Sequence, residues 1–74
     1  MKEIRENKTI EYDFRKYYLL YSKGKTVGQI PAVILHLDLV ISFENNIVKL
    51  YCNGFILAHW DNIDLITVNS FLGD

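Results

Sequence analysis

The sequence predicts an all-β or β-dominated fold in which residues 33–68 form a four-stranded antiparallel meander. Two observations carry this prediction: apolar and polar residues alternate from Leu35 onward, and pairs that contain Asn or Asp interrupt the alternation. A period of two is typical of strands, and Asn, Asp and Gly tolerate the positive φ of two-residue hairpin turns. The expected strands cover residues 33–44, 47–52, 55–60 and 63–68.

The first expected strand begins after Pro31, the only proline in the chain, because proline has no amide hydrogen and belongs at the start or edge of a strand. A turn at Asn45-Asn46 fixes the register of the first two strands. Three successive pairs of apolar residues then lie opposite one another: Phe43/Val48, Ile41/Leu50 and Leu39/Cys52. A shift of one residue would destroy this match.

Asn53-Gly54 gives the strongest short hairpin signal in the chain. A two-residue turn there continues the apolar face onto a third strand. The expected pairs on that face are Cys52/Phe55, Leu50/Leu57 and Val48/His59.

Asp61-Asn62 is the third expected turn, since both residue types favour turns. It adds a fourth strand beside the third. The expected pairs are Trp60/Ile63, His59/Asp64, Leu57/Ile66 and Phe55/Val68.

Residues 1–32 allow two interpretations. The alternation of Ile10, Tyr12 and Phe14 with charged residues favours a strand hairpin that closes a small barrel with the meander. The alternative is an α+β fold with a helix over residues 10–22 packed on the sheet, because aromatic residues also recur there at helical spacing.

Length and composition indicate one domain, residues 1–74, which buries roughly 60% of the surface that its unfolded chain exposes. The single cysteine, Cys52, excludes an intramolecular disulfide. No apolar run reaches the length of a signal peptide or a membrane span, so we expect a cytoplasmic protein without membrane contact. Residues 1–25 carry seven basic and four acidic side chains and residues 26–74 carry one and five, an asymmetry that could orient a partner.

The meander face opposite the expected core is unusually apolar for a sheet surface in contact with water. Either the N-terminal segment covers this face, or a protein partner or a second copy of the chain does. Because Trp and Tyr are favoured at the centres of interfaces, the face predicts four protein-binding residues: Tyr51, Ile56, Trp60 and Ile63.

The sequence argues against an enzyme. In the expected register His59 lies about 13 Å along the strand from Cys52, at roughly 3.3 Å per residue, which is too far for proton transfer between them. His36 points to the other face of the sheet. We therefore expect no catalytic residue, cofactor, metal site or small-molecule substrate.

Cations are interleaved with aromatic residues between positions 15 and 25, a combination that suits single-stranded nucleic acid. This pattern makes a nucleic-acid-binding small β-barrel the alternative functional hypothesis. The residues that would carry it are Arg15, Lys16, Tyr17, Tyr18, Lys23 and Lys25.

The leading hypothesis is a small non-enzymatic interaction module that binds a protein partner, with an inhibitor or regulator as one concrete form. Inhibitors of phage and mobile-element origin, anti-CRISPR proteins among them, are often single small domains. This form of the hypothesis rests on size and on missing chemistry, since no motif in the chain supports it.

Overall fold

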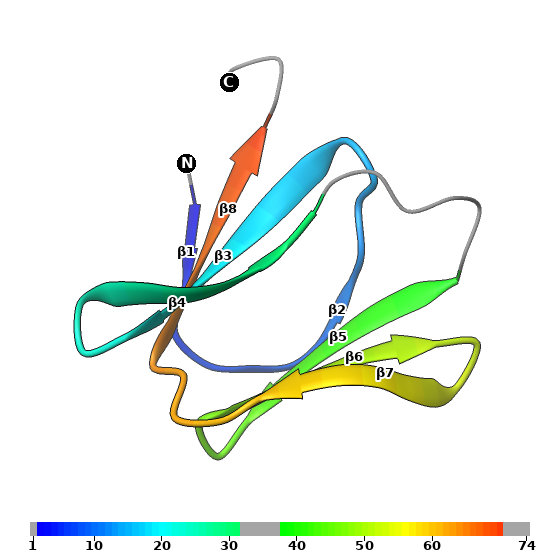
Figure 1. Cartoon of the computed structure of the whole chain (residues 1–74). Helices are drawn as coiled ribbons and strands as arrows, with labels where there is room; N and C mark the ends of the chain where they lie inside the picture. Colours follow the sequence, from blue (N-terminus) through cyan, green and yellow to red (C-terminus); the bar gives the residue numbers. More distant parts are fainter. Residues whose placement is uncertain (1, 32–37, 71–74) are drawn as a thin grey trace.

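The computed structural model describes residues 2–31 and 38–70 and confirms an all-β fold (Figure 1). Eight strands form two antiparallel four-stranded sheets, and the described residues contain no helix, so none that could cross a membrane. The strands are β1 (Lys2–Ile4), β2 (Asn7–Glu11), β3 (Lys16–Ser22), β4 (Lys25–Ile30), β5 (Leu39–Glu44), β6 (Ile47–Cys52), β7 (Phe55–Trp60) and β8 (Leu65–Ser70).

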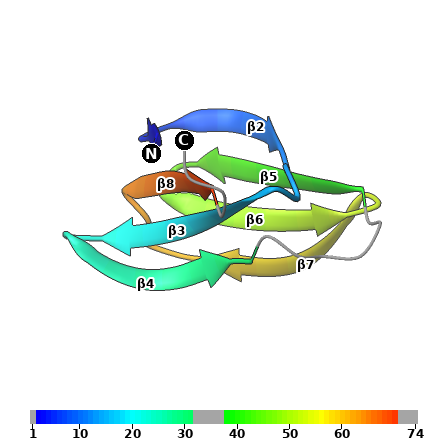
Figure 2. The same ribbon diagram turned by 90° about the horizontal axis from the view of Figure 1, so that it is seen from above.

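The two sheets lie face to face around a common core (Figure 1 and Figure 2). One has the strand order β1-β8-β3-β4, and the other has the order β2-β5-β6-β7. The closed barrel that the sequence favoured is not among the strand pairings that the structure shows, because each strand pairs only within its own sheet.

The hairpin of β5 and β6 has the predicted register. Asn45 and Asn46 have φ angles of 53° and 63°, as the two-residue turn requires. All three predicted pairs are present: Phe43/Val48, Ile41/Leu50 and Leu39/Cys52. Residues 33–37, the start of the predicted first strand, lie outside the described part of the chain.

The hairpin of β6 and β7 begins as predicted, with Asn53-Gly54 in the turn. The register then shifts: Tyr51 lies opposite Ile56, but the preceding Leu50 lies opposite Ala58. One residue of β7 is left without an opposite residue, which defines a β-bulge.

The extra residue is Leu57, and the bulge turns the remainder of β7 over. Trp60 consequently lies opposite Val48 on the core side, and His59 lies opposite Lys49 on the outer side. Leu57 is apolar like Ile56 and Ala58 on either side of it, so alternation could not reveal the bulge. Two predicted pairs are therefore wrong: Leu50/Leu57 and Val48/His59.

The last strand belongs to the other sheet, which overturns the predicted fourth strand of the meander. β8 pairs with β1 and β3 and does not pair with β7. Asp61-Asn62 is thus the start of a crossing between the sheets and not a hairpin turn. The predicted pairs of this strand are all wrong: Trp60/Ile63, His59/Asp64, Leu57/Ile66 and Phe55/Val68.

Two backbone hydrogen bonds fix the crossing. The amide of Ile63 donates to the carbonyl of Asn46 at 2.8 Å, and the amide of Asp64 donates to the carbonyl of Tyr21 at 2.9 Å. The crossing buries the Ile63 side chain completely. Between β1 and β3, β8 also has backbone partners on both sides, which an edge position beside β7 would not provide.

The N-terminal strand hairpin is confirmed, and the alternative helix over 10–22 is wrong. β3 and β4 are joined by Lys23-Gly24, with φ angles of 52° and 80°. Their register shifts near the turn and leaves Val27 as the extra residue of a bulge in β4.

The core consists of buried apolar side chains from both sheets and from the crossing between them. Trp60 packs against this core beside Gly28, where a Cβ would lie only 2.8 Å from the indole Nε1. Glycine therefore allows the indole to reach the backbone of β4. The buried core residues are Tyr18, Leu20, Ile30, Leu39, Ile41, Phe43, Val48, Leu50, Ile63, Ile66 and Val68.

All four edge strands are short or irregular. β1 has three residues, and β2, β4 and β7 each have one more residue than the matching stretch of their partner strand. Short and bulged edges disfavour the addition of a strand from another molecule. A partner of this fold is therefore expected to contact side chains.

Candidate functional site

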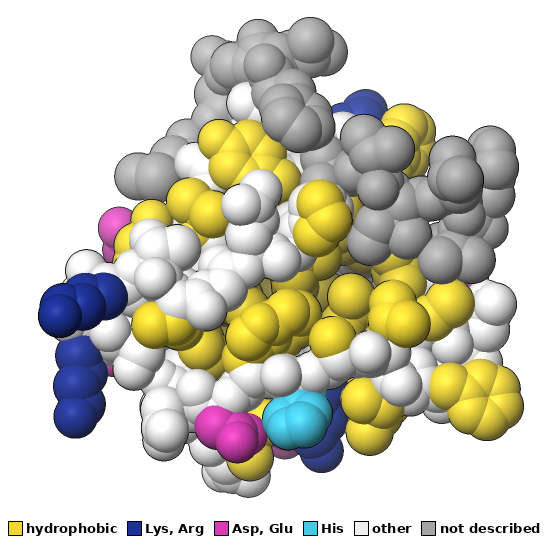
Figure 3. All heavy atoms as spheres, viewed as in Figure 1, with side chains coloured by type: hydrophobic (Ala, Val, Ile, Leu, Met, Phe, Trp, Pro, Cys, Tyr) yellow, Lys and Arg dark blue, Asp and Glu magenta, His cyan; other side chains and the backbone are white. Residues whose placement is uncertain are grey.

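The bulge in β7 coincides with an exposed apolar segment. Phe55, Ile56 and Leu57 expose 78%, 56% and 56% of their surface, and they are the only three successive large apolar residues that do so in the described chain. Figure 3 shows apolar side chains at the surface around the β6–β7 turn. The segment follows the turn directly and lies on an edge strand.

Ile56 extends this segment into a row across the outer face of its sheet. It lies opposite Tyr51 of β6, and Tyr51 lies opposite Val40 of β5. Tyr51 and Val40 are half-buried. We call Tyr51, Phe55, Ile56 and Leu57 the β7 surface. Tyr51 and Ile56 point to the outer face of the sheet, whereas Phe55 lies on the side of Cys52 at the exposed end of the hairpin.

Two acidic residues lie beside the β7 surface, near β2 and β5 on the far side of β6. Glu11 of β2 lies opposite Val40, and Asp38 immediately precedes β5. Both residues are exposed. The carbonyl of Asp38 accepts a hydrogen bond of 3.0 Å from the amide of Asn53, which places Asp38 next to the β6–β7 turn.

The four residues predicted to bind a protein are only partly brought together. Tyr51 and Ile56 are opposite one another on the outer face, whereas Trp60 packs on the core side of β7 and Ile63 is fully buried. The bulge turns Trp60 to the core side of β7, and the crossing carries Ile63 into the core between the two sheets. Protein binding by Tyr51 and Ile56 stays a prediction.

Phe55 and Leu57 were missed by the sequence reasoning for different reasons. Phe55 was assigned to the core face because it pairs with Cys52, but at the end of the hairpin that face extends beyond the core, and Phe55 remains exposed. Its position directly after the Asn53-Gly54 turn could have indicated exposure, because that position lies at the end of the hairpin. The sequence contains no comparable signal for Leu57, since its exposure depends on the bulge.

The residues predicted to bind nucleic acid have different surroundings. Tyr18 is buried in the core. Lys23 and Lys25 are exposed at the β3–β4 turn, whereas Lys16 and Tyr17 are half-buried at the opposite end of β3. Nucleic-acid binding through this segment stays a prediction, without the stacking surface that Tyr18 was expected to supply.

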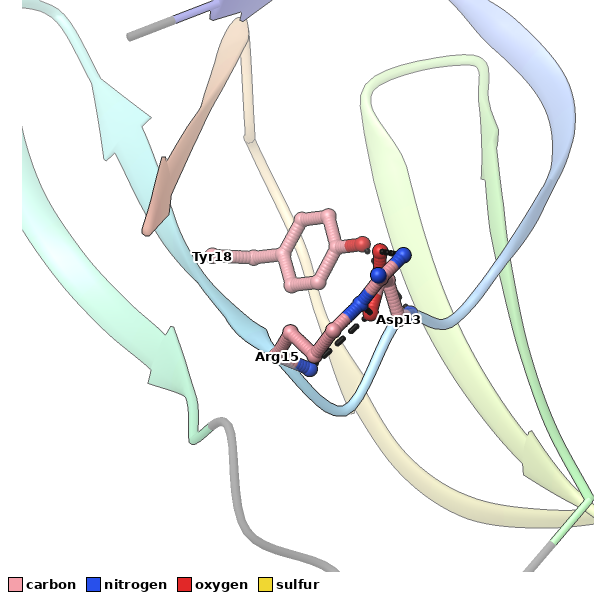
Figure 4. A network of polar contacts seen from close by, with 3 residues as sticks. All are labelled: Asp13, Arg15 and Tyr18. Atoms are coloured by element: carbon pink, nitrogen blue, oxygen red, sulfur yellow. Dashed lines mark hydrogen bonds and ion pairs between the residues drawn. The ribbon is translucent and has the colours of Figure 1, made fainter. Parts of the chain in front are cut away.

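The sixth of these residues, Arg15, belongs to a polar network in the β2–β3 loop (Figure 4). The Asp13 carboxylate accepts hydrogen bonds from the Arg15 side chain at 3.0 Å through Nε and Nη2, and from the Arg15 backbone amide at 2.9 Å. The Asp13 amide donates to the Tyr18 hydroxyl at 3.3 Å. The guanidinium of Arg15 is therefore already engaged by a carboxylate in a two-pronged contact.

This network predicts an unusual titration. The side-chain hydrogen bonds from Arg15, followed by its backbone amide, lower the pKa of Asp13 from 3.8 to about 2. Because the folded value is the lower one, the carboxylate stabilises the loop above the ordinary pKa and loses this effect as pH falls through the folded pKa. We expect an NMR titration of Asp13 with a midpoint near 2 and, in Arg15→Gln, a higher midpoint, because the guanidinium contacts are lost while the backbone amide of residue 15 still donates to the carboxylate. Identical midpoints would contradict the assignment.

Tyr12 lies in the same loop region with its ring centroid 5.4 Å from that of Tyr18. Its buried hydroxyl has no hydrogen-bond partner among the described residues. Burial, and then the neighbouring Tyr18 and Asp13, raise the pKa of Tyr12 to about 12. Tyr12 is thus a neutral phenol at physiological pH and not a base.

A polar depression occupies the end of the molecule where three chain connections meet. Its volume is about 530 Å³, and its lining hydrogen bonds are internal to the fold. The Lys23 amide donates to the Asp64 carboxylate at 2.9 Å, and the Asn46 side chain donates to the Ile63 carbonyl at 3.1 Å. These groups tie the turns together and give the depression a structural explanation.

Residues 2–31 and 38–70 hold no group of metal ligands, and they keep Cys52 and His59 on different sides of their sheet. No three His, Cys, Asp or Glu side chains are grouped there so as to hold a metal ion. Cys52 lies on the core side of β6, and His59 lies on the outer side of β7.

Fold and surface together define a small antiparallel β protein with an exposed apolar segment on the edge strand β7. Comparisons with known proteins add no relative: no family model, no curated protein and no solved structure matches the chain. A functional proposal therefore rests on the geometry of the molecule.

Proposed function

We propose that this chain is a non-enzymatic interaction module that binds a protein partner through the β7 surface. The observation that carries the proposal is the exposure of Phe55, Ile56 and Leu57, each more than half accessible to solvent. Fully burying one such side chain contributes roughly 1.5–3 kcal/mol. Clustered exposed apolar residues are typical of interaction sites, whereas single ones are common on any protein.

The composition of the β7 surface supports an interface. Phe55 and Tyr51 supply large, rigid side chains, and aromatic residues are enriched at the centres of protein interfaces. The acidic border formed by Glu11 and Asp38 favours a partner whose contact surface is apolar with basic groups at its rim.

The scaffold supports binding through side chains. The bulge at Leu57 interrupts the edge of β7, so a partner strand cannot follow it over its whole length. The β7 surface is nevertheless held by a hairpin whose other strand, β6, lies inside the sheet. Such a rigid surface loses little conformational entropy when a partner binds.

An inhibitor or regulator in the cytoplasm is the concrete form of this proposal. A small domain with one apolar surface can act by occupying a site on its partner. The half-buried free thiol of Cys52 suits a reducing compartment, where disulfides are rare.

Charge introduced into the β7 surface tests the proposal. We expect Phe55→Asp and Ile56→Asp each to reduce capture of a partner from host extract by at least about tenfold, which corresponds to roughly 1.4 kcal/mol. Capture is measured by quantitative mass spectrometry on the immobilised chain. Because both side chains are more than half exposed, thermal unfolding should remain close to that of the unmodified chain.

Phe14→Asp is the matched control, since Phe14 is 70% exposed and lies in the β2–β3 loop, outside the β7 surface. It should capture the same partner as the unmodified chain. Equal capture by Phe14→Asp, Phe55→Asp and Ile56→Asp would reject the β7 surface as the binding site. Light scattering of the purified chain separates a second copy from a different protein as the occupant.

A further inference from the structure

The β6–β7 turn presents an asparagine followed by a glycine at the tip of a hairpin. Asn53 and Gly54 have φ angles of 51° and 88°, and both residues are exposed. The backbone amide of Asn53 is held by the carbonyl of Asp38 at 3.0 Å. Its side-chain amide has no hydrogen bond to another described residue, and a Cβ placed on Gly54 would meet no atom within 4 Å apart from its chain neighbours.

We propose that Asn53 is a site of spontaneous deamidation that alters the β7 surface. The backbone nitrogen of Gly54 loses its proton and attacks Cγ of Asn53, so that a new C–N bond closes a five-membered succinimide. The side-chain nitrogen of Asn53 leaves as ammonia and carries the proton away. Water then opens the ring at either carbonyl and gives aspartate or isoaspartate at position 53.

Glycine makes Asn53 more reactive than the other described asparagines. With no Cβ, Gly54 hinders the attack least and adopts the backbone angles that it needs. The residues that follow the other described asparagines, Asn7, Asn45, Asn46, Asn62 and Asn69, all carry side chains.

Two of these asparagines are also held by the fold. The side chain of Asn46 donates to the carbonyl of Ile63 at 3.1 Å, and that of Asn69 donates to the hydroxyl of Thr67 at 3.2 Å. The corresponding group of Asn53 has no such restraint from described residues. Among the described asparagines, position 53 is therefore expected to react fastest.

Deamidation changes the charge and the backbone next to the β7 surface. A carboxylate with an ordinary pKa of about 3.9 is ionised at neutral pH, and here it adds a negative charge at a residue whose amide is bonded to Asp38 and which precedes Phe55 by two positions. The isoaspartate form also lengthens the main chain by one methylene inside a two-residue turn. This consequence for binding rests on the proposed function, whereas the modification itself does not.

Incubation of the folded chain in mildly alkaline buffer tests the modification. Trypsin cleavage at lysine isolates residues 50–74, which contain Asn53, Asn62 and Asn69, from residues 26–49, which contain Asn45-Asn46. Replacement of –NH2 by –OH adds about 1 Da, and we expect Asn53 to gain it about tenfold faster than any other described asparagine because Gly54 lacks a Cβ. Fragmentation of the peptides assigns the position.

Asn53→Gly is the control, because glycine tolerates the positive φ of this position and has no side-chain amide. It should remain unmodified and folded. A folded chain that keeps Asn53 intact, while the urea-unfolded chain deamidates there, would overturn the proposal. So would faster reaction at Asn45, Asn46, Asn62 or Asn69.

The effect on binding is read from aged and fresh samples of the same preparation. Loss of capture in the aged chain, with capture retained by aged Asn53→Gly, supports the altered surface. Deamidation without any change in capture would limit the proposal to the modification and overturn its effect on the β7 surface. A failure of Phe55→Asp to affect capture would reject the proposed function while leaving the mass measurement valid.

Discussion

Phe43→Ala is expected to lower the free energy of unfolding by about 3–5 kcal/mol, the usual cost of removing a buried phenylalanine. Phe43 is the largest fully buried side chain of the described residues, with 1% of its surface exposed. A domain of this length has a total stability of roughly 4–11 kcal/mol at 0.05–0.15 kcal/mol per residue. The substitution therefore removes a large part of the stability, and urea unfolding followed by circular dichroism measures the loss.

Phe14→Ala removes the same atoms from a site that is 70% exposed, and it provides the comparison. Substitutions at such surface sites usually change stability by no more than about 0.5 kcal/mol. Equal unfolding midpoints for the two variants would contradict the assignment of Phe43 to the core.

Gly28→Ala is expected to destabilise the fold by about 1–3 kcal/mol through overpacking. The added methyl would lie 2.8 Å from Nε1 and 2.9 Å from Cδ1 of Trp60, and 3.3 Å from Cδ1 of Leu20. The indole must then move away from β4, which opens this side of the core. The loss appears as a lower urea midpoint in circular dichroism.

A double-mutant cycle with Trp60→Ala isolates the steric cause. If the indole is the obstacle, Gly28→Ala should cost clearly less in the Trp60→Ala background than in the unmodified chain, because contacting sites are not additive. Additive effects of the two substitutions would show that Gly28 matters for another reason.

The fold was predictable where local chemistry determines it. Asn45-Asn46 and Asn53-Gly54 each specify a two-residue turn, and alternation then fixes the register of β5 and β6 from one residue pair to the next. The same alternation favoured strands over a helix in residues 10–22, which is correct for β2 and β3, although residues 12–15 form the loop between them. These signals depend only on residues close together in the sequence.

The errors arose where distant residues decide. Asp61-Asn62 has the composition of a hairpin turn, but contacts with Asn46 and Tyr21 direct the chain to the other sheet. Nothing near Leu57 in the sequence marks the bulge.

The candidate site was predicted correctly in one part and wrongly in another. Tyr51 and Ile56 came together because their pairing follows closely from Asn53-Gly54. Trp60 lies beyond the bulge and Ile63 lies in the crossing, so a prediction extended from the turn placed both on the wrong surface.

The position of β8 also has a consequence for how the chain acquires its structure during synthesis. β1 and β3 are made early, yet each pairs with β8, the last strand described, which leaves the ribosome after all the others. The sheet of β2, β5, β6 and β7 can assemble first. At that stage β1 has no pairing partner, and β3 can pair only with β4. Pairings between such distant segments fold slowly. The sheet of β1, β8, β3 and β4 is therefore the part of the nascent chain that is exposed longest to chaperones and to aggregation.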